Sequence, residues 1–216
     1  MKGAIEVPVG RFYCNKISQP IREKKDCILL LLDTLEILVA AMPLNGDEKA
    51  KIVIRNSKMS RAFYFMQDKY YSILFPFSLE EREENDSYAI YDPVLDMEVN
   101  NREISLMRTI LDRIDFINST VETMLESIYY DMEGEEYAGI EIERCWGLLM
   151  RMFSLELGYI RYDYDPEHVN GDFHPPHHLD INYSAKCTYK LGLKEKISIN
   201  DFTDLLDIQT KCKYLV

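Results

Sequence analysis

All four histidines of the chain fall in one short segment, between His168 and His178. The surrounding sequence, from Arg161 to Asp180, adds several carboxylates and an arginine. Imidazole and carboxylate groups bind transition metals and exchange protons near neutral pH, and arginine holds anionic oxygens. No other part of the sequence gathers so many groups of this kind, so this segment is the candidate functional site.

Two predicted strands would position these groups. Polar and apolar residues alternate from Gly158 to Tyr164 and again from His177 to Ser184, which is typical of half-buried strands. If the strands form a hairpin and both bury their apolar side, their polar side chains share one face. That face would present Arg161, Asp163, His178, Asp180 and Asn182, below a loop containing Glu167, His168, Asp172 and His174.

The expected chemistry is metal binding or acid–base catalysis. The candidate catalytic residues are Arg161, Asp163, His178 and Asp180, and the candidate metal ligands are His174, His178 and Asp180. Zinc, manganese or nickel would suit imidazole with carboxylate, whereas magnesium alone would not require so many histidines. Otherwise His174, His178 and Asp180 could act as general acid and base. Arg161 would then hold an anionic oxygen.

A structural role is the alternative for the same residues. Asp165-Pro166 and Asn170-Gly171-Asp172 are ordinary turn sequences, and His174-Pro175-Pro176 could be a rigid connector whose imidazole packs on aromatic rings. The sequence contains no H-E-x-x-H, G-x-x-x-x-G-K-S/T, G-x-G-x-x-G or G-x-S-x-G motif. A nuclease of the P-D…D/E-x-K type stays open, but its three parts have no clear positions.

Composition and charge limit the partners. The chain has 216 residues, 47% of them hydrophobic, which is enough for a substantial core. Its net charge of -12 opposes non-specific binding to nucleic acid, which depends on lysine and arginine. Nucleic acid is therefore expected only with a partner or at a local basic patch. The residues of that patch would be Lys49, Lys51, Arg55, Lys58, Arg61 and Lys69.

The cysteines and the hydrophobic segments favour a cytoplasmic protein. Five cysteines are scattered singly without a C-x-x-C pair, as expected for reduced thiols in a core. The first residues lack an apolar stretch of signal-peptide length. Cys27 to Met42 is the most hydrophobic window, but it is shorter than the roughly 20 residues that span a bilayer. We therefore expect no membrane segment.

The periodicity predicts an α+β fold in which an antiparallel sheet packs against about four helices, within a single domain of residues 1–216. Residues 1–99 would contain a helix from Cys27 to Met42, a β-meander from Lys51 to Phe77 and a strand in S-Y-A-I-Y-D-P. Residues 100–157 would form a helical hairpin. Residues 158–216 would contain the histidine-rich hairpin, a strand in T-Y-K-L-G-L and a helix ending near Tyr214.

One long helix is expected within the helical hairpin. Apolar residues recur every three or four positions from Asn101 to Tyr130, which predicts a helix of roughly 30 residues and about 45 Å. A second helix from Glu136 to Leu155 would pack on it. The apolar stripe exceeds what one neighbour of about 20 residues can cover, so we expect a protein partner or a homodimer.

The C-terminal quarter resembles a protein family. Its stretch R-Y-D-Y-D…H-P-P-H-H-L-D-I-N-Y-S, followed by T-Y-K-L-G-L and an amphipathic helix, is similar to uncharacterised bacterial proteins with an R-x-D…H-P-x-x-H-x-D/H-I/V motif. Some of these belong to mobile or phage-defence gene clusters. The resemblance implies a bacterial cytosolic setting but no particular activity. The positions that it carries over are Arg161, Asp163, His174, His178 and Asp180.

Two functions from different classes fit these observations. The first is a small metal-dependent or His/Asp hydrolase that cleaves a phosphodiester, as a nuclease-like effector of a defence or toxin-type system. The second is a non-catalytic subunit that binds a protein partner and uses the histidine hairpin as a rigid corner. The acidic net charge makes a partner that supplies a basic surface part of either hypothesis.

Overall fold

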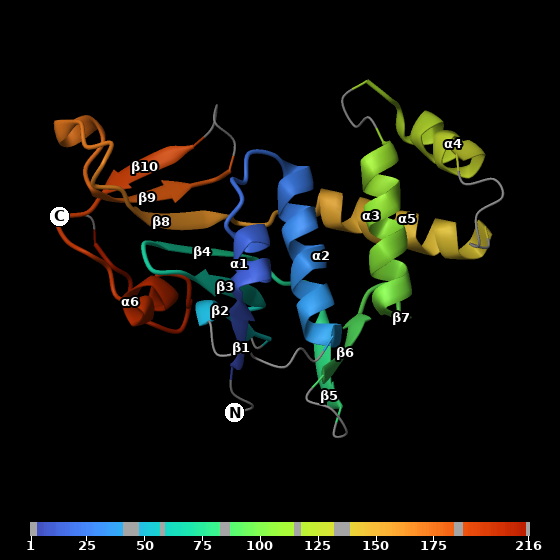
Figure 1. Cartoon of the computed structure of the whole chain (residues 1–216), viewed down its shortest axis with the longest axis horizontal. Helices are drawn as coiled ribbons and strands as arrows, with labels where there is room; N and C mark the ends of the chain where they lie inside the picture. Colours follow the sequence, from blue (N-terminus) through green and yellow to red (C-terminus); the bar gives the residue numbers. More distant parts are fainter. Residues whose placement is uncertain are drawn as a thin grey trace. The chain divides into compact units, whose positions relative to one another are not determined.

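Two antiparallel sheets and six α-helices make up the part of the chain that the computed structural model describes (Figure 1). The described residues are 4–40, 48–56, 59–82, 87–114, 118–131, 139–183 and 188–214. This architecture confirms the predicted α+β class. The chain divides into two compact units, residues 1–27, 42–76 and 156–216 in unit 1 and residues 28–41 and 77–155 in unit 2. That the chain is a single domain stays a prediction.

Unit 1 is built on a seven-stranded sheet with the order β1-β2-β3-β4-β8-β9-β10. The predicted meander forms its middle, and the predicted histidine hairpin follows beside β4. The first strand and the helix after it were not predicted, because a short edge strand containing Pro8 gives little periodic signal. The elements are β1 (Ile5–Gly10), α1 (Arg11–Ile17), β2 (Glu48–Arg55), β3 (Arg61–Phe65), β4 (Lys69–Leu74), β8 (Ile160–Tyr164), β9 (His177–Ile181) and β10 (Tyr189–Gly192).

Opposite faces of this sheet are covered by different helices. On one face, Phe202 of α6 (Ile199–Asp204) packs in a buried cluster with Tyr70 and Tyr162. On the other face, the Tyr71 hydroxyl donates to the carbonyl of Ile17 in α1. Because Tyr70 and Tyr71 are consecutive in a strand, they point to opposite faces. The candidate site must therefore lie on either the α1 side or the α6 side.

The C-terminal helix is shorter than expected. Ser198 caps its first turn by accepting from the amide of Asp201. The helix ends at Asp204 instead of near Tyr214. At this end the Thr210 hydroxyl donates to the Asp204 carbonyl at 2.6 Å, which satisfies a carbonyl that the helix leaves unpaired. The predicted extension is thus wrong.

Unit 2 contains a three-stranded sheet and most of the helical residues. Ion pairs join its helices: Arg108 to Asp33 at 2.6 Å, and Arg102 to Glu141 at 2.7 Å. The predicted strand in S-Y-A-I-Y-D-P and the predicted second helix are both present. The elements are β5 (Ser78–Arg82), β6 (Ser87–Asp92), β7 (Met97–Glu98), α3 (Asn101–Arg113), α4 (Val121–Asp131), α5 (Gly139–Ser154) and the larger part of α2 (Lys24–Ala40).

The helix α2 begins three residues earlier than the sequence indicated. We expected it to begin at Cys27, whereas it begins at Lys24. The Asp26 carboxylate accepts from the backbone amides of Arg22 at 2.8 Å and Glu23 at 3.1 Å, so it caps the helix from inside the first turn. Its predicted end at Met42 lies outside the described residues.

The single long helix from Asn101 to Tyr130 is wrong. The helix α3 ends at Arg113, and Ile114 is extended at φ -89° and ψ 131°. Before α4, the Thr120 hydroxyl accepts from the amide of Thr123 at 3.3 Å, so a second N-cap lies within the apolar pattern. The three-four spacing continued across this break because both helices bury apolar residues, and periodicity alone does not show a change of direction.

The prediction of a protein partner was based on the length of one continuous apolar stripe. Because the helix is broken, that argument no longer holds. Most residues of the stripe are buried in the described structure, so they do not form one exposed row. A protein partner or homodimer stays a prediction without this support. The buried residues of the stripe are Ile104, Met107, Ile110, Leu111, Ile114, Met124 and Ile128.

Among the described residues, no helix combines the length and apolar character needed to cross a bilayer.

Candidate functional site

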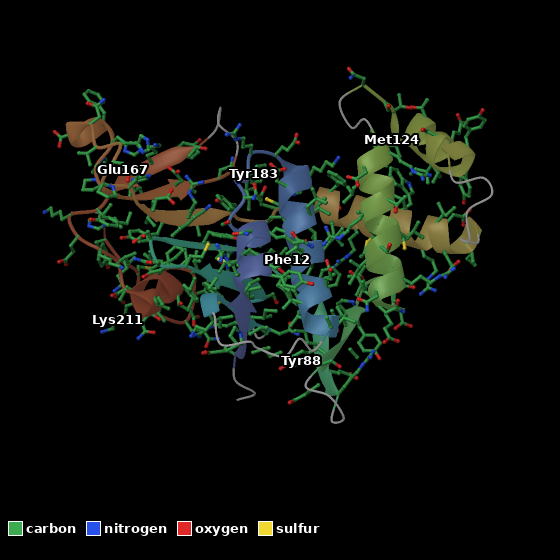
Figure 2. The ribbon with its side chains drawn as sticks, in the orientation of Figure 1. Phe12, Tyr88, Met124, Glu167, Tyr183 and Lys211 are labelled. Atoms are coloured by element: carbon green, nitrogen blue, oxygen red, sulfur yellow. The ribbon has the colours of Figure 1, made fainter. Side chains whose placement is uncertain are left out.

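The polar residues of β8 and β9 lie on one face of the sheet. Arg161 is directly opposite Asp180, and Asp163 is directly opposite His178. Directly opposed residues project to the same side of a sheet, so the predicted convergence is confirmed. The connection between these strands, marked by Glu167 in Figure 2, contains His168 and His174, and His177 is the first residue of β9.

The core on the opposite side sets this arrangement. Tyr162 and Leu179 alternate with the polar residues and are buried with Phe202 of α6. A shift of one residue in register would move these side chains out of the core and the charged groups into it. The polar cluster therefore lies on the α1 side of the sheet, where Tyr71 also points.

Arg161 joins the two carboxylates. Its Nε donates to Oδ2 of Asp163 at 2.5 Å, and its Nη2 donates to Oδ2 of Asp180 at 2.5 Å. Burial would lower the pKa of Arg161, but the neighbouring Tyr159, Asp163 and Asp180 outweigh burial and raise it. We expected Arg161 to hold a substrate anion. Its guanidinium instead contacts protein carboxylates, because both lie within reach on adjacent strand positions.

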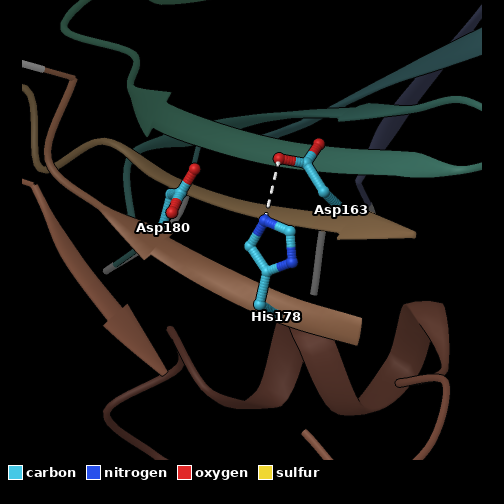
Figure 3. A group of neighbouring side chains, drawn as sticks. All are labelled: Asp163, His178 and Asp180. Atoms are coloured by element: carbon cyan, nitrogen blue, oxygen red, sulfur yellow. Dashed lines mark ion pairs between the residues drawn. The ribbon is translucent and has the colours of Figure 1, made fainter. Parts of the chain in front are cut away.

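His178 is held in a defined orientation. Its Nδ1 lies 3.1 Å from the carbonyl oxygen of Pro175. A carbonyl only accepts, so Nδ1 carries a proton. In the neutral form of the ring, Nε2 then carries the lone pair. This Nε2 faces Oδ2 of Asp163 at 3.7 Å, as Figure 3 shows, which is too long for a hydrogen bond. In its neutral form, the ring therefore directs an electron pair toward a carboxylate.

Asp163, His178 and Asp180 form a potential ligand set. One ligand atom from each residue lies within 4.8 Å of the others. The Oδ1 atom of Asp180 is buried and has no hydrogen-bond partner among the described residues. A buried carboxylate oxygen without a partner is destabilising, and a cation would satisfy it. The sequence predicted His174, His178 and Asp180 as metal ligands. In the structure, Asp163 instead of His174 lies close to His178 and Asp180.

His174 lies beside this set, in the connection between the strands. Its ring makes an edge contact with the ring of His178, with centroids 4.6 Å apart. Its Nε2 is 4.0 Å from Oδ2 of Asp165, and its Nδ1 is buried without a hydrogen-bond partner in the described structure. His174 therefore contacts His178 and is not one of the three residues of the compact group.

The remaining polar residues of the segment are further from the cluster. His168 is largely exposed and bonds Asp165 at 2.8 Å. This bond raises the pKa of His168 and lowers the pKa of Asp165. Glu167 and Asp172 are exposed. Asn182, at φ 74°, accepts from the amide of Tyr183 with its own side chain, so its role is that of a turn residue.

His177 belongs to the other face of the sheet. Its ring stacks on Tyr164 with centroids 4.7 Å apart, and its Nδ1 is 2.8 Å from the Tyr162 hydroxyl. This residue matches the structural alternative, in which an imidazole packs on aromatic rings. The segment thus contains both packing histidines and a histidine of the candidate site.

Lys69 is a site residue that the sequence did not reveal. It lies directly opposite Asp163 across β4 and β8, and its Nζ donates to the carbonyl of Ser18 at 3.3 Å. Burial lowers its pKa, and the nearby Arg161 lowers it further. The sequence placed Lys69 in a basic patch with Arg61. Because Lys69 alternates with the buried Tyr70, the sequence could have shown which face of the sheet Lys69 lies on. It could not have shown that β8 is the neighbouring strand.

The formal charges of the cluster balance without a metal ion. Lys69 and Arg161 count as cations, Asp163 and Asp180 count as carboxylates, and His178 is counted as neutral in this sum. A divalent ion would leave the cluster with two positive charges, which would attract an anionic substrate.

Comparisons of the chain with protein-family models, curated proteins and solved structures find no match.

Proposed function

We propose that this protein is a metal-dependent phosphodiester hydrolase whose divalent ion, zinc, manganese or nickel, is held by Asp163, His178 and Asp180. The observation that carries this proposal is the orientation of His178. Its Nδ1 lies against the carbonyl of Pro175, and its Nε2 faces the carboxylate of Asp163. Histidine ligands of metals commonly donate their other N–H to a carbonyl or carboxylate in this way.

The distance between His178 and Asp163 supports coordination by these two residues with little rearrangement. Two ligands about 2.1 Å from a tetrahedral zinc ion are about 3.4 Å apart. The observed separation between Nε2 of His178 and Oδ2 of Asp163 is 3.7 Å. Asp180 would contribute its unpaired Oδ1 while its Oδ2 stays bonded to Arg161. In this arrangement Arg161 positions the two carboxylates.

The proposed reaction follows from the ligand types. A bound divalent ion of this class lowers the pKa of a coordinated water and polarises a phosphoryl oxygen. With the ion present, the cluster would complement two negative charges, one on the ester and one on the deprotonated nucleophile. Lys69 and Arg161 would retain their positive charge beside the carboxylates, which limits the affinity for the metal.

The setting is also part of the proposal. The resemblance of the C-terminal segment favours a bacterial cytoplasmic effector of a defence or toxin-type system. The chain's net charge of -12 favours as substrate a nucleotide, or a nucleic acid presented by a partner with a basic surface.

Hydrolysis assays test the activity. Untagged protein would be incubated with bis(p-nitrophenyl) phosphate and with a single-stranded oligonucleotide, with and without each metal. We expect hydrolysis with metal, and a loss of about 100-fold for Asp163→Asn, because the variant removes a ligand charge. Asp172→Asn is the matched control, since Asp172 is exposed. Equal rates for the two variants, or no dependence on metal, would contradict the proposal.

The second candidate is a non-catalytic subunit that binds a protein partner. The observation that favours it is the bridge from Arg161 to both carboxylates, which lets the cluster hold the sheet together without an ion. Under this function, Asp163→Asn would lower thermal stability while neither variant nor wild type hydrolyses either substrate. The same set of variants therefore separates the two functions.

A further inference from the structure

A second group of charges lies on the other face of the unit 1 sheet. Arg55 in β2 and Arg61 in β3 are directly opposite each other. Arg61 also pairs with Leu74, at the opposite end of β4 from Lys69. The arginine pair is therefore separated from the candidate metal site by both the face and the end of the sheet, and this inference does not rest on the proposed function.

The guanidinium of Arg61 bonds only uncharged groups. Its Nε donates to the Ser72 hydroxyl at 2.9 Å, and its Nη2 donates to the carbonyls of Gly158 at 2.5 Å and Ser72 at 3.3 Å. Burial lowers the pKa of Arg61 to about 10, so the group is still a cation at neutral pH. Within the described part of the chain, its positive charge is thus held partly buried without a counter-charge.

Arg55 adds a second cation beside it. Its Nε is buried and has no hydrogen-bond partner among the described residues. Like charges directly opposed on neighbouring strands destabilise a sheet. The chain contains 37 acidic residues, yet within its described part no carboxylate pairs with either arginine. The fold therefore maintains two adjacent cations that nothing in the described protein neutralises.

We propose that Arg55 and Arg61 bind the phosphate group of a small anionic ligand. Guanidinium groups donate paired N–H bonds that match the oxygens of a phosphate. A phosphate monoester carries about 1.5 to 2 negative charges at pH 7, which compensates two arginines, whereas a carboxylate supplies only one charge. The terminal donors of the Arg55 guanidinium, a side chain that is partly exposed, and the remaining donors of Arg61 are the groups that would contact it.

Thermal unfolding of the full chain tests this site, with inorganic phosphate as the probe and sodium chloride at equal ionic strength as the reference. We expect phosphate to raise the Tm of the wild type more than chloride does, because a ligand of the native state stabilises it. Arg55→Gln should weaken the apparent phosphate affinity by about tenfold or more, since it removes one charge-assisted contact. Arg22→Gln is the matched control, because Arg22 is exposed.

A second readout separates binding from a folding defect. Without phosphate, Arg55→Gln should unfold at the same or a higher temperature than the wild type, since it removes repulsion from Arg61 and no hydrogen bond of its Nε. A wild-type protein that responds to phosphate no more than to chloride would overturn the proposal. So would an equal phosphate response in Arg55→Gln and Arg22→Gln, or an equal response of the wild type to acetate.

Discussion

Nε2 of His178 lies 3.7 Å from Oδ2 of Asp163, and the two residues are directly opposed on β9 and β8. The contact with Pro175 places a proton on Nδ1, so the ring in its neutral form directs a lone pair at the carboxylate. Two electron-rich atoms in this arrangement are stabilised by a cation or by a proton on the ring. This relationship is the basis of the proposed metal site.

Replacing Asp180 should destabilise the metal-free protein. Asp180 is buried, and its Oδ2 accepts from Arg161 at 2.5 Å. Asp180→Asn leaves Arg161 paired only with Asp163, so we expect the free energy of unfolding to fall by about 1–3 kcal/mol. Urea denaturation measures it, with Asp172→Asn, an exposed site, expected to change stability by less than about 0.5 kcal/mol. Equal stability of both variants would show that the pair with Arg161 contributes nothing.

The sheet that supports the site should depend on Phe202. This side chain is fully buried against Phe63, Phe65 and Tyr70. Phe202→Ala leaves a cavity there, so we expect a loss of about 3–5 kcal/mol in thermal or denaturant unfolding. Ile208→Ala, at a position 86% exposed, is the control and should be nearly neutral. A small effect at Phe202 would mean that α6 does not anchor this face.

The pair of His168 and Asp165 should titrate outside the usual ranges. Its hydrogen bond raises the pKa of His168 and lowers that of Asp165. The contribution of His168 is therefore fully present below its unfolded pKa and is lost as pH rises through its folded pKa. The contribution of Asp165 is lost as pH falls through its own lowered pKa. The pair is thus strongest at mildly acidic pH, between these limits.

NMR titration of the imidazole checks this prediction. In Asp165→Asn, the pKa of His168 should return toward its ordinary value, because the charged acceptor is gone. Glu167→Gln is the control, since the bond to Asp165 is the larger influence on His168. An unchanged pKa of His168 in Asp165→Asn would contradict the observed contact.

Strand parity made the site predictable from the sequence. Tyr162 alternates with Arg161 and Asp163, and one buried face fixes the register of β8 against β9. This local period is sufficient to place four polar residues together. The orientation of His178 was not predictable, because it depends on where the backbone places the Pro175 carbonyl relative to Nδ1 of the ring.

Long-range pairing and chain reversal were not predictable in the same way. Lys69 joins the cluster only because β4 lies beside β8, and no local pattern specifies which distant strands become neighbours. His174 was expected to bind metal because it is close in sequence to His178, but its ring lies beside that residue instead. The break at Ile114 was missed since the apolar spacing continues in α4.

Metal stoichiometry tests the central claim most directly. Untagged protein would be dialysed against zinc, manganese or nickel and its metal content measured by mass spectrometry. We predict one bound ion per chain, lost in both His178→Asn and Asp163→Asn and retained in His168→Asn, whose imidazole is exposed and outside the ligand group. A wild-type protein that binds none of these metals, or the same metal content in His178→Asn and His168→Asn, would contradict the account.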